Sequence, residues 1–159
     1  MVIYFSGTGN SKYIADRIAA SLQEKLLCMN ERIKSGNTGS VKTGENLIVV
    51  VPTYAWRIPR VVSDWIGQTE FVGTKNVWYV MSCGSGIGGA DIYNRKLSEK
   101  KGLKHMGTAQ IIMPESKNNI SGYPRKGQTN AKITDYRRLI NAVYVLLRES
   151  SQKYTFCKN

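Results

Sequence analysis

The sequence contains few acidic side chains. Its 159 residues include 11 Asp and Glu against 23 Lys and Arg, which gives a net charge of +12, and only one His. Neither a Ser-His-Asp set nor a pair of carboxylates stands out, so the sequence gives no support for hydrolysis. The positive charge favours association with acidic proteins, nucleic acid or anionic surfaces, although a generally basic solvated surface explains the same composition.

Cysteine motifs and long apolar runs are also missing. The three cysteines, Cys28, Cys83 and Cys157, lack the spacing of metal ligands and are odd in number. We therefore expect free or buried thiols, no metal site and no disulfide framework. A stretch of about 20 apolar residues, as needed to span a membrane, does not occur. The chain begins directly with an apolar segment, without a basic leader and cleavage site, and we expect a cytoplasmic protein.

The main motif is a short apolar segment followed by a turn of small and hydroxylated residues and then a helix. It covers residues 4–12, with the sequence Y-F-S-G-T-G-N-S-K. Glycines let the backbone bend tightly and approach a ligand, and the N–H groups that open a helix suit an anion. The spacing differs from that of a nucleotide-kinase P-loop, and the third glycine of the dinucleotide fingerprint is missing. The motif predicts a phosphate cradle for a mononucleotide, formed by Ser6, Gly7, Thr8, Gly9, Asn10 and Ser11.

Apolar segments alternate with helical patterns along the rest of the chain. We expect strands at residues 2–5, 26–29, 47–51, 76–81 and 105–113, helices ending near residue 24 and around residues 61–66, 90–97 and 131–149, and loops at residues 34–46 and 114–128. Strands that alternate with helices imply parallel pairing through right-handed crossovers. The sequence therefore predicts a single α/β domain over residues 1–159, with an open parallel sheet covered on both faces. His105, at the start of the last strand, is expected to be structural.

The cradle motif resembles the flavin phosphate loop of the flavodoxin family. It is most similar to flavodoxin-like domains that begin with F-S-G-T-G-N-S and are often fused to a bacterial-type ferredoxin. The resemblance implies a three-layer αβα sandwich with a five-stranded sheet of order 2-1-3-4-5, and FMN outside the carboxyl ends of the first and third strands. Because Cys-x-x-Cys is missing, the ferredoxin module is not expected. Electrons would then pass to a separate redox partner, for which an acidic ferredoxin is a candidate.

In this family, the loops after the third and fourth strands meet the cradle at the flavin. The resemblance assigns to them Pro52, Thr53, Tyr54, Ala55 and Trp56, and Ser82, Cys83, Gly84, Gly86 and Gly88. Tyr54 or Trp56 is the preferred residue for stacking on the flavin ring, although each of them could instead fill the core. Ala55 stands where flavodoxins often have glycine, and we expect alanine to adopt a positive φ poorly there.

Three functions stay open from the sequence. The leading prediction is an FMN-binding flavodoxin-like electron carrier without catalytic residues of its own. The alternative within the family is a small FMN-dependent NAD(P)H or quinone oxidoreductase. The alternative of another class is a basic nucleic-acid or polyanion binding module, against which the dispersed charge and the missing nucleic-acid motif argue. Arg57, Arg60, Arg125 and Lys126 are expected beside the pocket, where they could receive an anionic partner or remain solvated.

Overall fold

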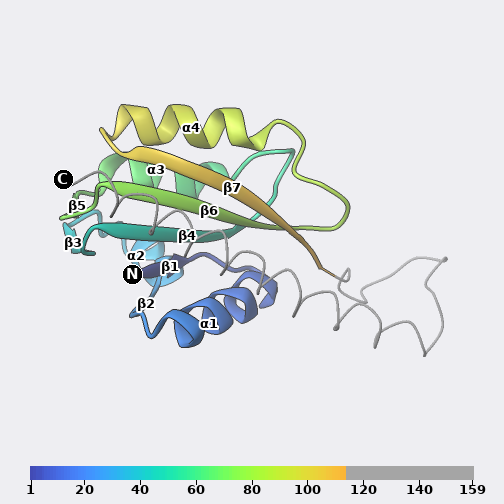
Figure 1. The fold of residues 1–159 in the computed structure, drawn as a ribbon, viewed down its shortest axis with the longest axis horizontal. Helices are drawn as coiled ribbons and strands as arrows, with labels where there is room; N and C mark the ends of the chain where they lie inside the picture. Colours follow the sequence, from blue (N-terminus) through green and yellow to red (C-terminus); the bar gives the residue numbers. More distant parts are fainter. Residues whose placement is uncertain (114–159) are drawn as a thin grey trace, which may run out of the picture.

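The computed structural model describes residues 1–113, which form a parallel β-sheet with helices packed against it (Figure 1). In this part of the chain the main sheet has five strands, which follow one another in space as β2 (Leu26–Cys28), β1 (Val2–Tyr4), β4 (Asn46–Pro52), β6 (Asn76–Cys83) and β7 (Lys104–Ile112). Every neighbouring pair is parallel. Counted along the chain within this sheet, the order is 2-1-3-4-5, as predicted.

Helices lie on both faces of the sheet (Figure 1). The described helices are α1 (Asn10–Leu22), α2 (Met29–Lys34), α3 (Arg60–Gln68) and α4 (Ala90–Lys100). The buried side chains of α1 pack in one apolar cluster with one face of the sheet, and those of α2, α3 and α4 pack in a second cluster with the other face. This arrangement follows from the crossover connections between parallel strands.

Strand β4 forms the centre of the sheet, and its sequence explains why. Val49, Val50 and Val51 are 0% exposed. Val49 and Val51 belong to the cluster with α2, α3 and α4, whereas Ile48 and Val50 belong to the cluster with α1. A parallel strand that is covered on both faces needs a continuous apolar run, which residues 47–51 provide.

The segment 34–46, predicted as one loop, contains more structure than expected. Helix α2 extends to Lys34, and β3 (Val41–Lys42) pairs in parallel with β5 (Phe71–Val72) as a separate two-stranded sheet. The Asn37 carbonyl accepts a hydrogen bond from Trp65 Nε1 at 2.8 Å. Because side-chain and backbone hydrogen bonds fix this polar segment, hydrophobic periodicity does not reveal it.

The buried faces of α3 and α4 also differ in part from the prediction. Val62, Trp65 and Ile66 of α3 are buried, but Val61 is exposed. In α4, the inward positions include two polar residues, Asn94 and Ser98, while Tyr93 faces outward. An apolar periodicity alone cannot find a helix face that is buried through hydrogen bonds. The predicted loop 114–128 and helix 131–149 lie outside the described residues.

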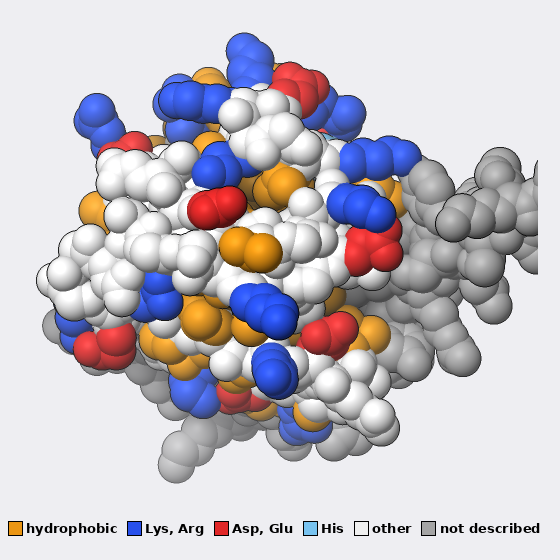
Figure 2. All heavy atoms as spheres, turned by 90° about the vertical axis from the view of Figure 1, so that its left-hand side faces the viewer, with side chains coloured by type: hydrophobic (Ala, Val, Ile, Leu, Met, Phe, Trp, Pro, Cys, Tyr) orange, Lys and Arg blue, Asp and Glu red, His pale blue; other side chains and the backbone are white. Residues whose placement is uncertain are grey.

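The edge of the sheet where the strands begin carries basic and acidic side chains intermixed (Figure 2). Lys75 there pairs with Glu45 at 3.3 Å, and the amino group of Met1 pairs with Glu24 at 2.9 Å. Exposed pairs of this kind contribute about 0–1 kcal/mol each to stability. Within residues 1–113, no helix has the length and apolar character that crossing a membrane requires.

Candidate functional site

The carboxyl ends of β1, β4 and β6 open into three loops that border one pocket of about 410 Å³. These strands are parallel neighbours, so their exits lie at the same edge of the sheet. The pocket is lined by Ser6, Gly7, Thr8, Asn10, Ser11, Pro52, Thr53, Tyr54, Ser82, Cys83, Gly84 and Met113. The structure thus brings together the three loops that the sequence singled out.

The loop between β1 and α1 is a tight turn that presents the start of a helix. Gly9 has φ 94°, a left-handed value that favours glycine, and its N–H donates to Ser6 Oγ at 3.0 Å. Gly9 is also the N-cap of α1 and has no side chain to cap the helix. The first N–H groups of α1 therefore remain available for an anionic ligand.

Asn30, in the first turn of α2, holds the beginning of this loop. Its Oδ1 accepts a hydrogen bond from the Ser6 N–H at 3.0 Å, and its Nδ2 donates to the Ser6 carbonyl at 2.9 Å. The Cys28 thiol donates to the same Oδ1 at 3.6 Å. The hydrogen bond between Cys28 and Tyr4 is the largest of the causes that raise the pKa of Tyr4 to about 12. Asn30 was not found from the sequence, because a lone Asn in a short helix carries no signal.

A buried hydrogen bond connects two of the pocket loops. The hydroxyl groups of Ser11 and Ser82 lie 2.8 Å apart, and both side chains are buried. The Ser82 carbonyl also accepts a hydrogen bond from the Thr53 N–H at 2.8 Å. Ser82 therefore positions the start of α1 and the exit of β4 relative to each other.

The loop after β4 contains a two-residue turn from Tyr54 to Arg57. The two end residues exchange backbone hydrogen bonds, Tyr54 N–H to Arg57 O at 2.8 Å and Arg57 N–H to Tyr54 O at 3.1 Å. The central residues Ala55 and Trp56 have φ of 48° and 58°, as in a type I′ turn. Ala55 thus adopts the positive φ that alanine tolerates poorly compared with glycine, and the hydrogen bonds of the turn hold it there at a cost of about 1–2 kcal/mol.

The two candidate stacking residues are placed differently. Tyr54 lines the pocket, and its hydroxyl oxygen lies 3.2 Å from where a Cβ on Gly7 would be. Trp56 does not line the pocket, and it packs instead on the glycine loop, where a Cβ on Gly88 would lie 2.6 Å from its Cδ1. Gly9, Ala55, Gly86 and Gly88 are likewise absent from the lining.

The lining suits an anionic ligand that also carries hydroxyl groups and a flat ring. Thr53 Oγ1 is buried and has no hydrogen-bond partner among the described residues, so a bound ligand could satisfy it. Gly7 leaves space under the Tyr54 hydroxyl that a side chain would take. Within the described residues, no charged side chain lines the pocket. An anion there would be bound by backbone N–H groups and hydroxyls, as at helix N-termini generally.

Cys83 lines this pocket, and its side chain is favoured in the protonated thiol form. Burial raises its pKa, and its Sγ donates to the Ile111 carbonyl at 3.7 Å. Because the thiolate is the reactive form, a raised pKa argues against nucleophilic catalysis. Within residues 1–113, no group of His, Cys, Asp and Glu side chains could hold a metal ion.

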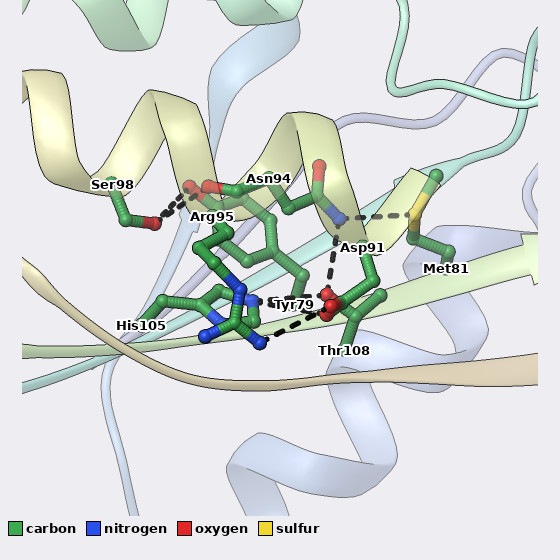
Figure 3. Close-up of polar contacts among 8 residues, drawn as sticks. All are labelled: Tyr79, Met81, Asp91, Asn94, Arg95, Ser98, His105 and Thr108. Carbon is green, nitrogen blue, oxygen red and sulfur yellow. Dashed lines mark hydrogen bonds and ion pairs between the residues drawn. The ribbon is translucent and has the colours of Figure 1, made fainter. Parts of the chain in front are cut away.

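A second group of polar side chains lies away from the pocket, between α4 and strands β6 and β7 (Figure 3). Asn94 Nδ2 donates to Thr108 Oγ1 at 3.3 Å, and His105 Nε2 lies 3.1 Å from the same oxygen. The His105 ring stacks on Tyr79 with 5.8 Å between ring centroids. The ring of His105 is enclosed within this network, in agreement with the structural role expected for it.

Of the four basic residues expected beside the pocket, two lie in the described part of the chain. Arg57 lies in the exit of β4, three residues after the pocket-lining Tyr54, and Arg60 begins α3; neither of them lines the pocket. Arg125 and Lys126 lie outside the described residues. Met113 lines the pocket without having been predicted, because its position after β7 shows no pattern in the sequence.

A protein-family model described as a flavodoxin domain matches residues 1–115. A comparison with curated proteins finds no sequence that matches the chain.

Solved structures resemble this fold at low sequence identity. A protein from Bacteroides uniformis assigned as a flavoprotein has a TM-score of 0.58 at 15% identity, over 72% of this chain and 90% of its own. A mutant of a flavo di-iron protein from Thermotoga maritima has a TM-score of 0.53 at 15% identity, over 94% of this chain and 35% of its own. A short-chain flavodoxin associated with a bacterial microcompartment has a TM-score of 0.50 at 17% identity, over 93% and 95%. These likenesses concern the fold.

Proposed function

The chain belongs to the flavodoxin domain family, and from this premise we propose that it binds FMN noncovalently in the pocket and carries electrons between redox partners. The three-layer αβα architecture of the family is part of the proposal, and the helices on both faces of the sheet support it. Bound FMN would supply the redox chemistry, and the protein would bind, orient and shield it.

The convergence of three strand exits on one neutral, hydroxyl-rich pocket carries this proposal. The phosphate would be held at the cradle by the free N–H groups of α1 together with Ser6, Thr8 and Asn10. Tyr54 would face the ring, and Thr53 Oγ1 would find its hydrogen-bond partner on the cofactor. Gly7 and Gly84 in the lining would let the backbone approach the cofactor closely.

Electron carriage is favoured over oxidoreductase chemistry by the groups that are available for proton transfer. The described lining contains no His, Asp, Glu or Lys, and burial raises the pKa of the Cys83 thiol. It therefore offers no imidazole, carboxylate or amine for proton transfer. A carrier exchanges electrons with a reduced and an oxidised protein partner and needs no such group.

The absorption spectrum of the purified protein tests cofactor binding. We expect a yellow protein that releases FMN on denaturation and that rebinds FMN more tightly than riboflavin. Thr8→Asp places a negative charge in the cradle, so FMN affinity should fall by about tenfold or more, while riboflavin affinity should fall less. Ser40→Asp makes the same charge change at an exposed site outside the pocket and should leave both affinities unchanged.

Retention of no flavin, together with no binding of added FMN, would contradict the proposal. A second measurement separates the carrier from the reductase. Steady-state oxidation of NADH or NADPH by the isolated FMN-loaded protein should be negligible. Fast turnover of either nucleotide with a quinone would favour the oxidoreductase instead.

A further inference from the structure

We propose that exposed apolar and arginine side chains beside the pocket form a docking surface for an acidic redox protein. This surface, called the rim surface below, consists of Tyr54, Trp56, Val61, Ile92 and Tyr93, together with Arg57 and Arg60. The inference rests on the proposed function, because a partner docked there would border the cofactor pocket.

Exposed apolar side chains gather in these segments. Of the nine exposed large apolar residues in the described part of the chain, five lie in the exit of β4 or in the first turns of α3 and α4. Trp56 is 67% exposed and Ile92 is 58% exposed, the two highest values among them. Single exposed apolar residues need no explanation, but a group of them next to a ligand pocket indicates an interaction site.

Contacts between different segments hold parts of the rim surface in place. Arg57 Nη2 donates to the Tyr93 hydroxyl at 2.8 Å, and its Cζ lies 3.8 Å from the centroid of the Tyr93 ring. Trp56 packs on the backbone of Gly88 in the next loop. These contacts fix side chains before any partner binds, so less side-chain entropy is lost on association.

The charge of the rim surface is positive. Segments 52–63 and 82–90 contain no Asp or Glu. Asp64 follows one turn into α3, and Asp91 forms an ion pair with Arg95 at 3.4 Å. By contrast, the opposite edge of the sheet carries both signs intermixed (Figure 2). A local positive field on a chain of net charge +12 is complementary to an acidic surface.

The composition of the rim surface favours a protein over a nucleic acid. Trp, Tyr and Arg are the residues enriched at the centres of protein interfaces. Binding to a phosphate backbone instead depends on several Lys and Arg side chains that each displace a counterion. The rim surface has five apolar residues and two arginines. Binding there would therefore depend mainly on the burial of apolar area, with a small number of ion pairs.

Direct binding measurements test the proposal without electron transfer. The probes are a [2Fe–2S] ferredoxin of negative net charge, a cytochrome c of positive net charge and a DNA duplex of about 20 base pairs. Each is titrated by calorimetry into the full chain, with and without FMN. The rim variants are Arg60→Glu and Val61→Ser. Their matched controls at the opposite edge are Lys42→Glu and Val72→Ser, both exposed residues of the small β3–β5 sheet.

We expect the ferredoxin to bind the unmodified chain and the cytochrome c not to bind. Arg60→Glu should weaken ferredoxin binding by about tenfold and Val61→Ser by about threefold, while each control changes it by less than about twofold. The affinity should also fall as salt is added.

Three results would overturn the proposal: no ferredoxin binding, equal losses for Arg60→Glu and Lys42→Glu, or duplex DNA that binds more tightly and shows the same dependence on Arg60. The first two remove the docking surface, and the third assigns it to nucleic acid. The failure of the proposed function looks different, because a chain that retains no FMN can still bind the ferredoxin through the rim surface.

Discussion

The carboxamide of Asn30 pairs with the backbone of Ser6 through two hydrogen bonds, of 3.0 and 2.9 Å. One donor and one acceptor of a side chain thus satisfy the N–H and the carbonyl of the first residue in the cradle. Ser6 Oγ in turn accepts the N–H of Gly9. Asn30 of helix α2, 24 residues further along the chain, therefore sets the position of the loop that is proposed to hold phosphate.

Asn30→Ala should weaken FMN binding more than riboflavin binding. The substitution leaves the Ser6 N–H and carbonyl without their partner, which costs about 1–3 kcal/mol and loosens the cradle. We expect the Kd for FMN, measured by flavin fluorescence quenching, to rise by about tenfold. Asn76→Ala is the control, because it removes a carboxamide that bonds to Asn46 at the opposite edge of the sheet. Equal losses for FMN and riboflavin would contradict a role of Asn30 at the phosphate end.

Gly88→Ala should destabilise the protein mainly through Trp56. The new Cβ would lie 2.6 Å from Trp56 Cδ1, and Gly88 has φ 53°, so the substitution combines overpacking with backbone strain. Together these cost about 2–4 kcal/mol. In a Trp56→Ala background the ring is gone, and the close contact that remains beside the strain is the one to the Cβ of residue 56, at 3.1 Å, so the cost should fall by about 1 kcal/mol or more. Urea unfolding of the unmodified protein, the two single variants and the double variant gives the coupling free energy between positions 56 and 88. Additive losses of stability would show that Trp56 and Gly88 are not in close contact.

The pocket could largely be predicted from sequence, because parallel strands end at a common edge and their exit residues are therefore brought together. Asn30 could not be predicted, since α2 has six residues and is too short to show a helical period. Trp56 was one of two residues expected at the ring, and it lies outside the pocket lining because of a turn with positive φ at two residues that disfavour it. The two backbone hydrogen bonds between Tyr54 and Arg57 close this turn against the conformational preference of its central residues.

Ala55→Gly should stabilise the protein, although glycine usually does the opposite. Ala55 has φ 48°, where glycine lacks the strain of about 1–2 kcal/mol that a side chain brings, and this gain exceeds the added entropy of the unfolded chain. We expect a gain of about 0.5 kcal/mol in the free energy of unfolding. Ala20→Gly, at an exposed position in α1, should instead cost about 0.5–1 kcal/mol. Thermal or urea unfolding that shows the same sign for both substitutions would contradict the strained turn.

The unprotonated form of His105 should be favoured in the folded protein, and stability should fall in acid for this reason. Burial lowers the pKa of His105, and Arg95 lowers it further, while Asp91 and Glu99 act in the opposite direction. In the unfolded chain His105 has the ordinary histidine pKa of about 6.5. Below that pH the unfolded chain therefore binds more protons than the folded chain. The free energy of unfolding therefore decreases as the pH falls from about 6.5 towards the lowered pKa of the folded state.

His105→Phe tests this dependence, because it keeps a ring against Tyr79 and removes the titration. Thr108 Oγ1 retains its hydrogen bond from Asn94 in the variant. Urea unfolding of both proteins between about pH 8 and pH 5 gives the difference in stability at each pH, in which the shared titration of carboxylates cancels. We expect this difference to shift in favour of the variant as the pH falls. A difference that stays constant, or that shifts in favour of the unmodified protein, would show that His105 takes up its proton as readily in the folded network as in the unfolded chain.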